Sequence, residues 1–386
     1  MTETLHAIGI AEIIFWLSLA AVFYAYFGYP ALLFLLSGLT RREIRAGNRD
    51  YTPTVSLLIP VHNEEAVIER KLKNTFSIAY PAERLEVIIV SDGSTDRTRE
   101  IVGRNLSGRM RFLELPTRSG KAAALNYGLK SATGEIVVFS DSSIMLDKNA
   151  IRSIVLKFQD PAVGCVSGED HIEGPGGEGL YGRYELFLRN LESRVHSIVG
   201  ASGSFYAERR EACEPFREGL APDFLSVLNI VDKGYRAVTE PAAFGTMTSV
   251  TGVKDEFRRK ARTLVRGMAA LFSNARLMNP LRTGVFSLEL LSHKVARWLV
   301  PFFMVSLLVS NAFLLRNLPY AVFFALQASF YALAGLAFLR IGGLHERTLG
   351  RVPLYFTAVN AAILYAWLLY ATGIRMEIWN PSKRQA

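Results

Sequence analysis

Four long uncharged hydrophobic runs flank a more polar middle of the chain. They cover residues 13–36, 298–315, 318–339 and 352–374. Each run is long enough, or nearly so, to cross a hydrocarbon core of about 30 Å at a rise of 1.5 Å per residue. A large soluble protein could bury such runs as core helices, but four of them around a polar middle favour membrane helices.

Between these runs, short strands and helices alternate from about residue 54. The apolar stretches that predict strands are residues 55–60, 85–90, 111–115, 135–140 and 163–167. The intervening segments that are compatible with helices are residues 64–78, 95–104, 121–131 and 147–158. Continuous apolar strands are typical of a sheet covered on both faces, and regular alternation implies right-handed crossovers. The pattern predicts an α/β domain with a mostly parallel sheet.

The pattern changes after Gly168. A glycine-rich loop at residues 174–177 leads into a long predicted helix over 179–199, and a basic helix with one apolar stripe is predicted over 254–277. The basic helix is compatible with a place on a membrane surface. It is equally compatible with an ordinary domain helix whose basic face is solvated.

Charge and cysteine content narrow the function classes. The chain has 386 residues and a formal net charge of +9, and much of the positive charge lies beside the hydrophobic runs. Basic residues there meet anionic lipid, and the aromatic–basic interleaving of single-strand binders is missing, so no nucleic-acid partner is expected. Two cysteines, Cys165 and Cys213, exclude a cysteine-based zinc site and are expected to be reduced core residues.

The distribution of basic residues predicts an orientation in the membrane. Arginines follow the first hydrophobic run at positions 41, 42, 45 and 49, and others lie between the last two runs at 340, 347 and 351. The positive-inside rule then puts the middle domain in the cytosol and the N-terminus outside. Four spans would leave the basic tail from Arg375 outside, against the rule, so a re-entrant run or an interfacial tail is the alternative.

An acidic turn follows two of the predicted strands. Residues 91–96 read Ser-Asp-Gly-Ser-Thr-Asp after one strand, and residues 140–143 read Ser-Asp-Ser-Ser after another. Strand ends are where an α/β sheet binds its ligand. Two strand-end aspartates therefore indicate a site for a nucleotide, a divalent cation, or both.

Together, five motifs resemble those of a family 2 glycosyltransferase with the GT-A fold. They are residues 55–65 (VSLLIPVHNEE), 92–96 (DGSTD), 118–121 (RSGK), 200–204 (GASGS) and Asp223. The membrane arrangement is similar to that of cellulose, chitin-oligosaccharide and hyaluronan synthases. The resemblance implies a Rossmann-like cytosolic domain, a nucleotide-sugar donor and Mg²⁺ or Mn²⁺ as cofactor.

The resemblance assigns the donor side of the site. Pro60, Asn63 and Glu64 would frame the nucleotide, and Asp92 would contact a uracil-type base; without the resemblance, Asp92 reads as a cap or turn residue. Asp141 matches the first aspartate of the DxD motif, whose metal neutralises the leaving nucleoside diphosphate. Ser143 stands at the third position of that motif in place of aspartate.

The phosphate and acceptor sides are assigned in the same way. Lys121 begins a predicted helix, so its charge and the helix N-terminus could both face phosphate, although a surface lysine is the alternative. Asp223 matches the aspartate that serves the family as base; alone it reads as an N-terminal helix residue. The acceptor-facing loop is Ser202, Gly203 and Ser204.

One motif of the processive synthases is missing. Their Gln-x-x-Arg-Trp motif corresponds here to residues 258–267, which contain no tryptophan. Arg259 and Arg262 remain to offset pyrophosphate charge. The missing tryptophan favours a few additions over polymerisation through a channel.

These inferences predict an inverting glycosyltransferase that spans the inner membrane several times. It would move a hexose from a UDP-sugar to a glycan or polyprenyl-linked acceptor, in the synthesis of surface polysaccharide. The expected parts are a membrane helix (1–39), a GT-A domain (50–250), amphipathic interface helices (251–292), about three membrane helices (295–374) and a tail (375–386). Two alternatives are a polyprenyl-phosphate glycosyltransferase and a non-catalytic nucleotide-sugar-binding subunit.

Overall fold

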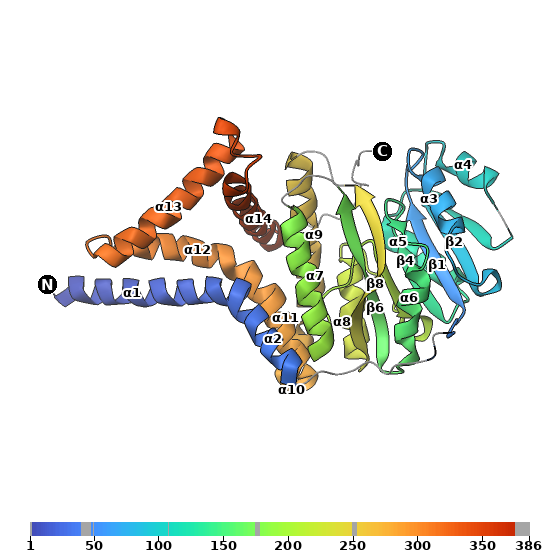
Figure 1. Ribbon diagram of the computed structural model, residues 1–386, viewed down its shortest axis with the longest axis horizontal. Coiled ribbons are helices and arrows are strands. Elements are labelled where there is room, and N and C mark those ends of the chain that lie inside the picture. The colour runs from blue at the N-terminus through green and yellow to red at the C-terminus, as the bar shows by residue number, and fades with distance from the viewer. Residues whose placement is uncertain are drawn as a thin grey trace. The chain divides into compact units, whose positions relative to one another are not determined.

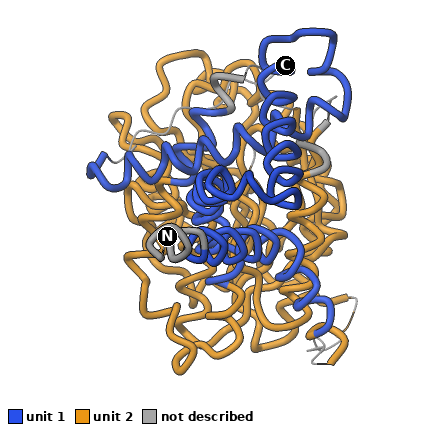
Figure 2. The backbone as a smooth tube through the Cα atoms, turned by 90° about the vertical axis from the view of Figure 1, so that its left-hand side faces the viewer, with its two compact units in different colours: residues 1–35, 257–264, 290–374 blue, residues 36–256, 265–289, 375–386 orange. Residues whose placement is uncertain are grey.

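The chain forms two compact units in the computed structural model, which describes residues 2–39, 48, 50–106, 108–173, 178–248 and 253–374 (Figure 1). The helical unit comprises residues 1–35, 257–264 and 290–374, and the sheet unit comprises residues 36–256, 265–289 and 375–386 (Figure 2). The arginines at 41, 42, 45 and 49, the loop at 174–177 and the tail from residue 375 lie outside the described residues.

The sheet unit is built on one eight-stranded mixed sheet. Its strands are β1 (Val55–Val61), β2 (Leu85–Asp92), β3 (Met110–Leu115), β4 (Ile136–Ser140), β5 (Met145–Leu146), β6 (Val163–Glu173), β7 (Phe205–Arg209) and β8 (Arg236–Thr248). Their order is β3-β2-β1-β4-β7-β6-β8-β5. The first four are parallel to one another, β7 runs antiparallel between β4 and β6, and β8 is parallel to β6. The predicted mostly parallel sheet is confirmed, and the structure adds the antiparallel strand β7.

Helices cover both faces of the parallel strands. The helices of this unit are α3 (Ile68–Phe76), α4 (Thr98–Arg104), α5 (Lys121–Ser131), α6 (Ala150–Leu156), α7 (Glu178–Val195), α8 (Pro222–Asp232), the second part of α9 (Val253–Ser273), α10 (Pro280–Thr283) and most of α11 (Val285–Leu290). Leu57 and Ile59 of β1 share a buried cluster with residues of α3 and α6. Leu58 points to the other face, where a Cβ on Gly128 of α5 would lie 2.5 Å from it. Glycine thus lets α5 lie close to the sheet.

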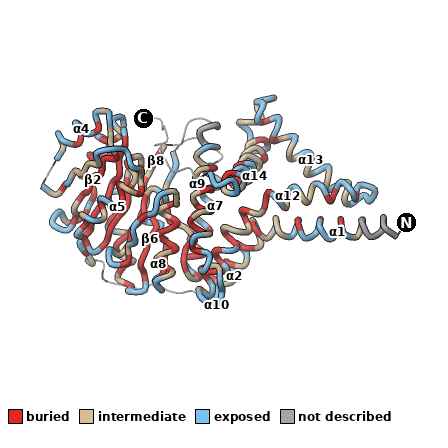
Figure 3. Tube along the Cα trace, turned by 180° about the vertical axis from the view of Figure 1, so that it is seen from behind, coloured by how far each residue is buried: buried red, intermediate tan, exposed pale blue. Residues whose placement is uncertain are grey.

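The strand interiors form the core, as the burial pattern along the trace shows (Figure 3). Every residue of β1 and β4 is buried. The continuous apolar runs in the sequence reflect this two-sided burial, because a strand with one solvated face would alternate instead.

Two of the boundaries that differ from the sequence prediction lie next to the site. α3 begins at Ile68 and not at residue 64, because the Glu64 and Glu65 amides donate to Thr98 Oγ1 and Asp96 Oδ2. β2 extends to Asp92, which pairs with Leu115 of β3. Asp92 is therefore the last residue of a strand and does not lie in the turn that follows.

The helical unit contains the long apolar helices. They are α1 (Thr2–Phe23), a π-helical turn (Tyr24–Gly28), the first part of α2 (Tyr29–Leu39), α12 (Arg297–Ala312), α13 (Leu318–Phe338) and α14 (Thr348–Ala371). Four stretches are long and apolar enough to cross a membrane by length and composition: Gly9–Leu39, Val285–Ala312, Leu318–Phe338 and Thr348–Ala371. Aromatic contacts join them within the unit, such as Phe15 of α1 against Tyr320 and Phe323 of α13.

Candidate active site

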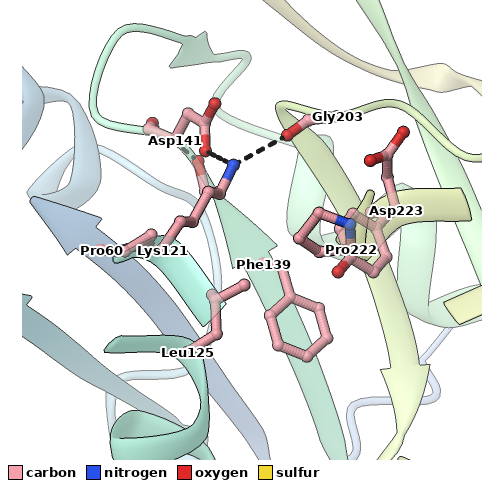
Figure 4. A pocket seen from close by; sticks show the side chains of 10 residues that line it. Pro60, Lys121, Leu125, Phe139, Asp141, Gly203, Pro222 and Asp223 are labelled. Atoms are coloured by element: carbon pink, nitrogen blue, oxygen red, sulfur yellow. Dashed lines mark hydrogen bonds and ion pairs between the residues drawn. The ribbon is translucent and has the colours of Figure 1, made fainter. Parts of the chain in front are cut away.

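The carboxyl ends of β1 and β4 lie side by side at the point where the strand order reverses. After β1 the chain adds β2 and β3 on one side and β4 on the other. Open α/β sheets bind ligands in the crevice at such a point. A small pocket lies here in the sheet unit, lined by Pro60, Lys121, Leu125, Phe139, Ser140, Asp141, Gly203, Tyr206, Pro222 and Asp223 (Figure 4).

Asp92 organises the loop that leads into α5. Its side chain is fully buried, and its two carboxylate oxygens accept hydrogen bonds from the Ser119 amide (2.6 Å) and the Gly120 amide (2.9 Å). Gly120 has a φ of 94°, which glycine adopts readily. Asp92 therefore fixes the backbone just before Lys121. Its contact with a base remains a prediction.

Asn63 and Glu64 connect the end of β1 to both acidic turns. Asn63, at a φ of 52°, accepts a hydrogen bond through Oδ1 from the Thr95 amide (2.8 Å). Glu64 accepts one through Oε1 from the Ser142 hydroxyl (2.8 Å). The two residues thus hold the turns after β2 and β4 at the same edge of the sheet, beside Pro60, which lines the pocket.

Lys121 and Asp141 form an ion pair in the pocket. Lys121 is the first residue of α5, and its Nζ lies 2.5 Å from Asp141 Oδ1 and 3.3 Å from the Gly203 carbonyl oxygen. Figure 4 shows the ammonium between Asp141 and Gly203. The lysine lines the pocket, and its contact with phosphate remains a prediction.

Asp223 lies on the other side of Gly203 from Asp141 (Figure 4). It is the second residue of α8, after Pro222 at the first position, where proline is favoured. A Cβ built on Gly203 would lie 3.8 Å from Asp223 Oδ2, so the exposed glycine leaves space beside the carboxylate. The two aspartates, 82 positions apart in sequence, thus line one pocket.

In the loop at residues 202–204, Ser202 is buried and Gly203 is exposed. Ser202 is fully buried; its Oγ donates to Asp170 Oδ1 (2.5 Å) and accepts from the Ser204 amide (3.1 Å). The Ser204 carbonyl in turn accepts from the Asp141 amide at 2.9 Å. Ser202 thus supports the loop from within, and Gly203 is the member that faces the pocket.

Arg259 and Arg262 lie on α9 in the helical unit. Burial, followed by repulsion from Arg259, lowers the pKa of Arg262.

No sequence motif marks three buried polar residues of the sheet unit. Tyr206 lines the pocket and stacks on Phe139, with 4.7 Å between ring centroids. Glu208 lies two positions further along β7, and burial raises its pKa to about 7. Lys71, on α3, is fully buried. Lys71 was detectable in principle, because it occupies a position on the buried stripe of α3 that Ile68, Leu72 and Thr75 share.

The described residues contain no cluster of three or more His, Cys, Asp or Glu side chains that could hold a metal. The pocket offers Asp141, with Ser143 half-buried two positions later. One carboxylate suits Mg²⁺ or Mn²⁺ bound through substrate phosphates, because these ions keep several waters and need few protein ligands. The residues present therefore fit a metal that binds together with a diphosphate.

Comparisons with known proteins agree with this geometry. Residues 56–214 match the family model described as Glycosyl transferase family 2. The probable glycosyltransferase YdaM of Bacillus subtilis (strain 168) is 37% identical over 215 residues, 51% of each chain. The poly-beta-1,6-N-acetyl-D-glucosamine synthase of Staphylococcus aureus (strain COL) is 28% identical over 210 residues, 51% of this chain and 50% of that one. The chain spans about half the length of these curated relatives.

A solved structure is similar over almost the whole chain. The mannosyltransferase PcManGT from Pyrobaculum calidifontis, in complex with GDP-Man and Mn²⁺, matches with a TM-score of 0.75 and 26% sequence identity. The match covers 94% of this chain and 99% of that one. From the sheet order, the residues at the ends of β1, β2 and β4, and these similarities, we conclude that residues 56–214 form a glycosyl transferase family 2 domain with the GT-A fold.

Proposed function

We propose that this glycosyltransferase moves a hexose from a nucleotide-sugar, preferably a UDP-sugar, to a glycan or polyprenyl-linked acceptor, with inversion at the anomeric carbon. The observation that carries the proposal is that Lys121, Asp141 and Asp223 line one pocket at the switch point of the sheet. A cation, a metal-binding carboxylate and a second carboxylate are the groups that the transfer requires.

On the donor side, the proposed roles follow from charge and position. Lys121 at the N-terminus of α5 neutralises phosphate together with the helix dipole. Pro60, Asn63, Glu64 and Asp92 frame the nucleoside. Arg259 and Arg262 add positive charge for the pyrophosphate.

Asp141, assisted by Ser143, is proposed to hold Mg²⁺ or Mn²⁺. When bound, the metal would supply charge neutralisation for the departing nucleoside diphosphate. Lys121 already pairs with Asp141 Oδ1, so the metal would compete with the ammonium for this carboxylate.

On the acceptor side, Asp223 is proposed as the general base. It would take the proton of the acceptor hydroxyl while the hydroxyl oxygen attacks the anomeric carbon and the nucleoside diphosphate leaves. Ser202, Gly203 and Ser204 form the proposed acceptor loop. Glycine at its tip lets a sugar approach the backbone closely.

We further propose that the enzyme works at the cytoplasmic membrane in surface polysaccharide synthesis, with the catalytic domain in the cytosol. The proposed division is a membrane helix (1–39), the transferase domain (50–250), interface helices (251–292), a C-terminal membrane region (295–374) and a tail (375–386). Four helices of suitable length and composition support membrane anchoring.

A release assay on the purified full-length chain tests the proposal. The donors are UDP-, GDP- and dTDP-sugars, each with and without Mn²⁺, followed by product sizing and determination of the anomeric configuration. We expect metal-dependent release of the nucleoside diphosphate from a UDP-sugar and a β-linked product. Donor binding without release would instead favour a non-catalytic subunit, and a retained configuration would refute inversion.

The base assignment is tested by Asp223→Asn. A well-placed general base contributes about 10²–10⁴-fold, so we expect turnover to fall by that factor while donor affinity in calorimetry stays the same. Asp232→Asn, at the other end of α8 and paired with Arg276 and Arg282, is the matched control and should retain wild-type turnover. Full activity of Asp223→Asn would favour a polyprenyl-phosphate acceptor, whose oxygen needs no strong base.

A further inference from the structure

Lys71 is a basic side chain enclosed in the core of the sheet unit, directly behind the turn that carries Asp141. It lies on the buried face of α3 and is fully buried. Within the described residues, no ion pair joins its Nζ to a carboxylate. Enclosing an ammonium without a close counter-ion costs several kcal/mol in general, so a lysine at this position requires a local reason.

That reason lies in its two hydrogen bonds. Lys71 Nζ donates to Ser140 Oγ at 2.8 Å and to the Ile144 carbonyl oxygen at 2.7 Å. These two acceptors stand immediately before and immediately after the segment 141–143. One ammonium therefore closes the base of the turn that presents Asp141 to the pocket.

Other bonds hold the same turn from other sides. The Asp141 amide donates to the Ser204 carbonyl at 2.9 Å, and the Ser142 hydroxyl donates to Glu64 at 2.8 Å. Lys71 differs from these because its single amine binds both ends of the turn. Burial lowers its pKa to about 7, and the Asp141 carboxylate acts in the opposite direction, so the lysine and the aspartate interact electrostatically.

The proposed metal site depends on the orientation of one carboxylate in this turn. Serine at position 143 leaves Asp141 as the single carboxylate of the turn. A site with one carboxylate depends on the orientation of that group, because the turn has no second carboxylate to compensate for a displacement. Groups that orient a metal ligand are typically worth about 10- to 100-fold in affinity.

We propose that Lys71 is a positioning residue of the donor–metal site: by clamping Ser140 and Ile144 it holds the Asp141 carboxylate in the orientation that binds the metal–diphosphate. The inference rests on the proposed metal-dependent function. It assigns Lys71 no contact with the substrate.

The test measures Mn²⁺ binding to the purified full-length protein with saturating UDP, from the electron paramagnetic resonance signal of free Mn²⁺. In Lys71→Met, which keeps the length of the side chain and removes the charge, we expect the dissociation constant to rise about 10- to 100-fold. Ser140→Ala removes one of the two acceptors and should raise it by a smaller factor. Apparent unfolding temperatures are recorded for every variant.

Asn74→Ala is the matched control. Asn74 lies three positions from Lys71 on α3 and binds both the amide and the carbonyl of Leu146, beyond the turn. Its loss should lower the unfolding temperature and leave Mn²⁺ affinity at the wild-type value. A purely structural role for Lys71 would give the same result in Lys71→Met, namely lower stability with wild-type affinity, and that result would overturn the inference.

The outcomes separate this inference from the proposed function. If the wild-type protein with UDP does not bind Mn²⁺, the proposed metal site and the inference are both overturned. If the wild type binds and Lys71→Met binds equally well, only the inference is overturned. If Lys71→Met does not fold, Ser140→Ala decides, since unchanged affinity in that variant also overturns it.

Discussion

At the scale of single residues, the candidate active site is built from charged groups whose partners come from distant parts of the chain. Asp141 meets Lys121 from α5, and Asp92 meets the amides of residues 119 and 120. The residues next to each of these side chains in the sequence do not show which group it will bind. Two predictions follow from the charges themselves.

The first concerns the cation that pairs with Asp141. Lys121→Met should weaken binding of the nucleotide-sugar about 10- to 100-fold, because a charge-assisted contact to phosphate is lost. The same change should tighten Mn²⁺ binding in the absence of nucleotide, because the ammonium 2.5 Å from Asp141 no longer competes with the metal. Calorimetric titrations with each ligand measure both effects.

Lys130→Met, on the exposed last turn of the same helix, is the control and should change neither affinity. Weaker Mn²⁺ binding by Lys121→Met in the absence of nucleotide would contradict the proposed competition.

The second concerns the buried carboxyl of Glu208. Burial raises its pKa from 4.5 to about 7, so in this interval the folded protein binds a proton that the unfolded chain has released. The free energy of unfolding therefore decreases as the pH rises from about 4.5 to about 7. Glu208→Gln, which mimics the protonated form, should match the wild type at low pH and exceed its unfolding temperature at pH 8.

Thermal unfolding from pH 5 to pH 8 provides the measurement. Glu214→Gln, at an exposed position in the same unit, gives the baseline and should not gain stability over the wild type with rising pH. A constant difference between Glu208→Gln and the wild type across this range would argue against a buried proton on Glu208.

At the scale of elements, backbone conformation brings the phosphate-side loop against the sheet. Gly93 follows β2 with a φ of 59°, and a Cβ there would lie 2.5 Å from the Arg118 amide nitrogen. The residue must therefore be glycine for two reasons, namely its positive φ and the close approach of residues 117–118. This contact, with the bonds to Asp92, fixes the start of α5.

Gly93→Ala should accordingly displace the loop before Lys121. We expect a loss of stability of more than the ~1–2 kcal/mol that left-handed backbone costs an ordinary residue, together with weaker nucleotide binding. Gly234→Ala is the matched control, since Gly234 has a φ of 85° but open space around its Cβ position. It should lose stability without losing nucleotide affinity; equal nucleotide affinity in both variants would contradict the role of the loop.

At the scale of the whole molecule, the proposed orientation in the membrane can be tested with two exposed arginines. Arg316 lies in the link between α12 and α13, and Arg347 lies in the link between α13 and α14. The proposed orientation puts the first link outside and the second in the cytosol. In a Cys213→Ser background, Arg316→Cys should react with a membrane-impermeant maleimide on intact cells, and Arg347→Cys only after permeabilisation.

The two variants control for each other, because both replace an exposed arginine in a short interhelical link. Cys165 is fully buried and should give no background signal. Labelling of Arg347→Cys on intact cells would reverse the proposed orientation.

Hydrophobic pattern alone determined much of this protein. It predicted the alternating strands and helices of the sheet unit and the long apolar helices. The strands were predictable because a strand that is buried on both faces has a continuous run of apolar residues. α5 begins and ends where the pattern placed it, at Lys121 and Ser131. The short motifs at Asp92, Lys121 and Asp141 indicated the family, since each lies at a strand end or a helix start.

Only the tertiary structure decided which side chains meet. Asp223 follows Asp141 by 82 positions, and Gly203 stands between them because β7 lies beside β4 in the sheet. Lys71 lies on the buried stripe of α3, but only the fold puts its amine behind the turn of β4. Local patterns report burial and backbone preference, whereas pairing across the sheet depends on strand order, which no local pattern contains.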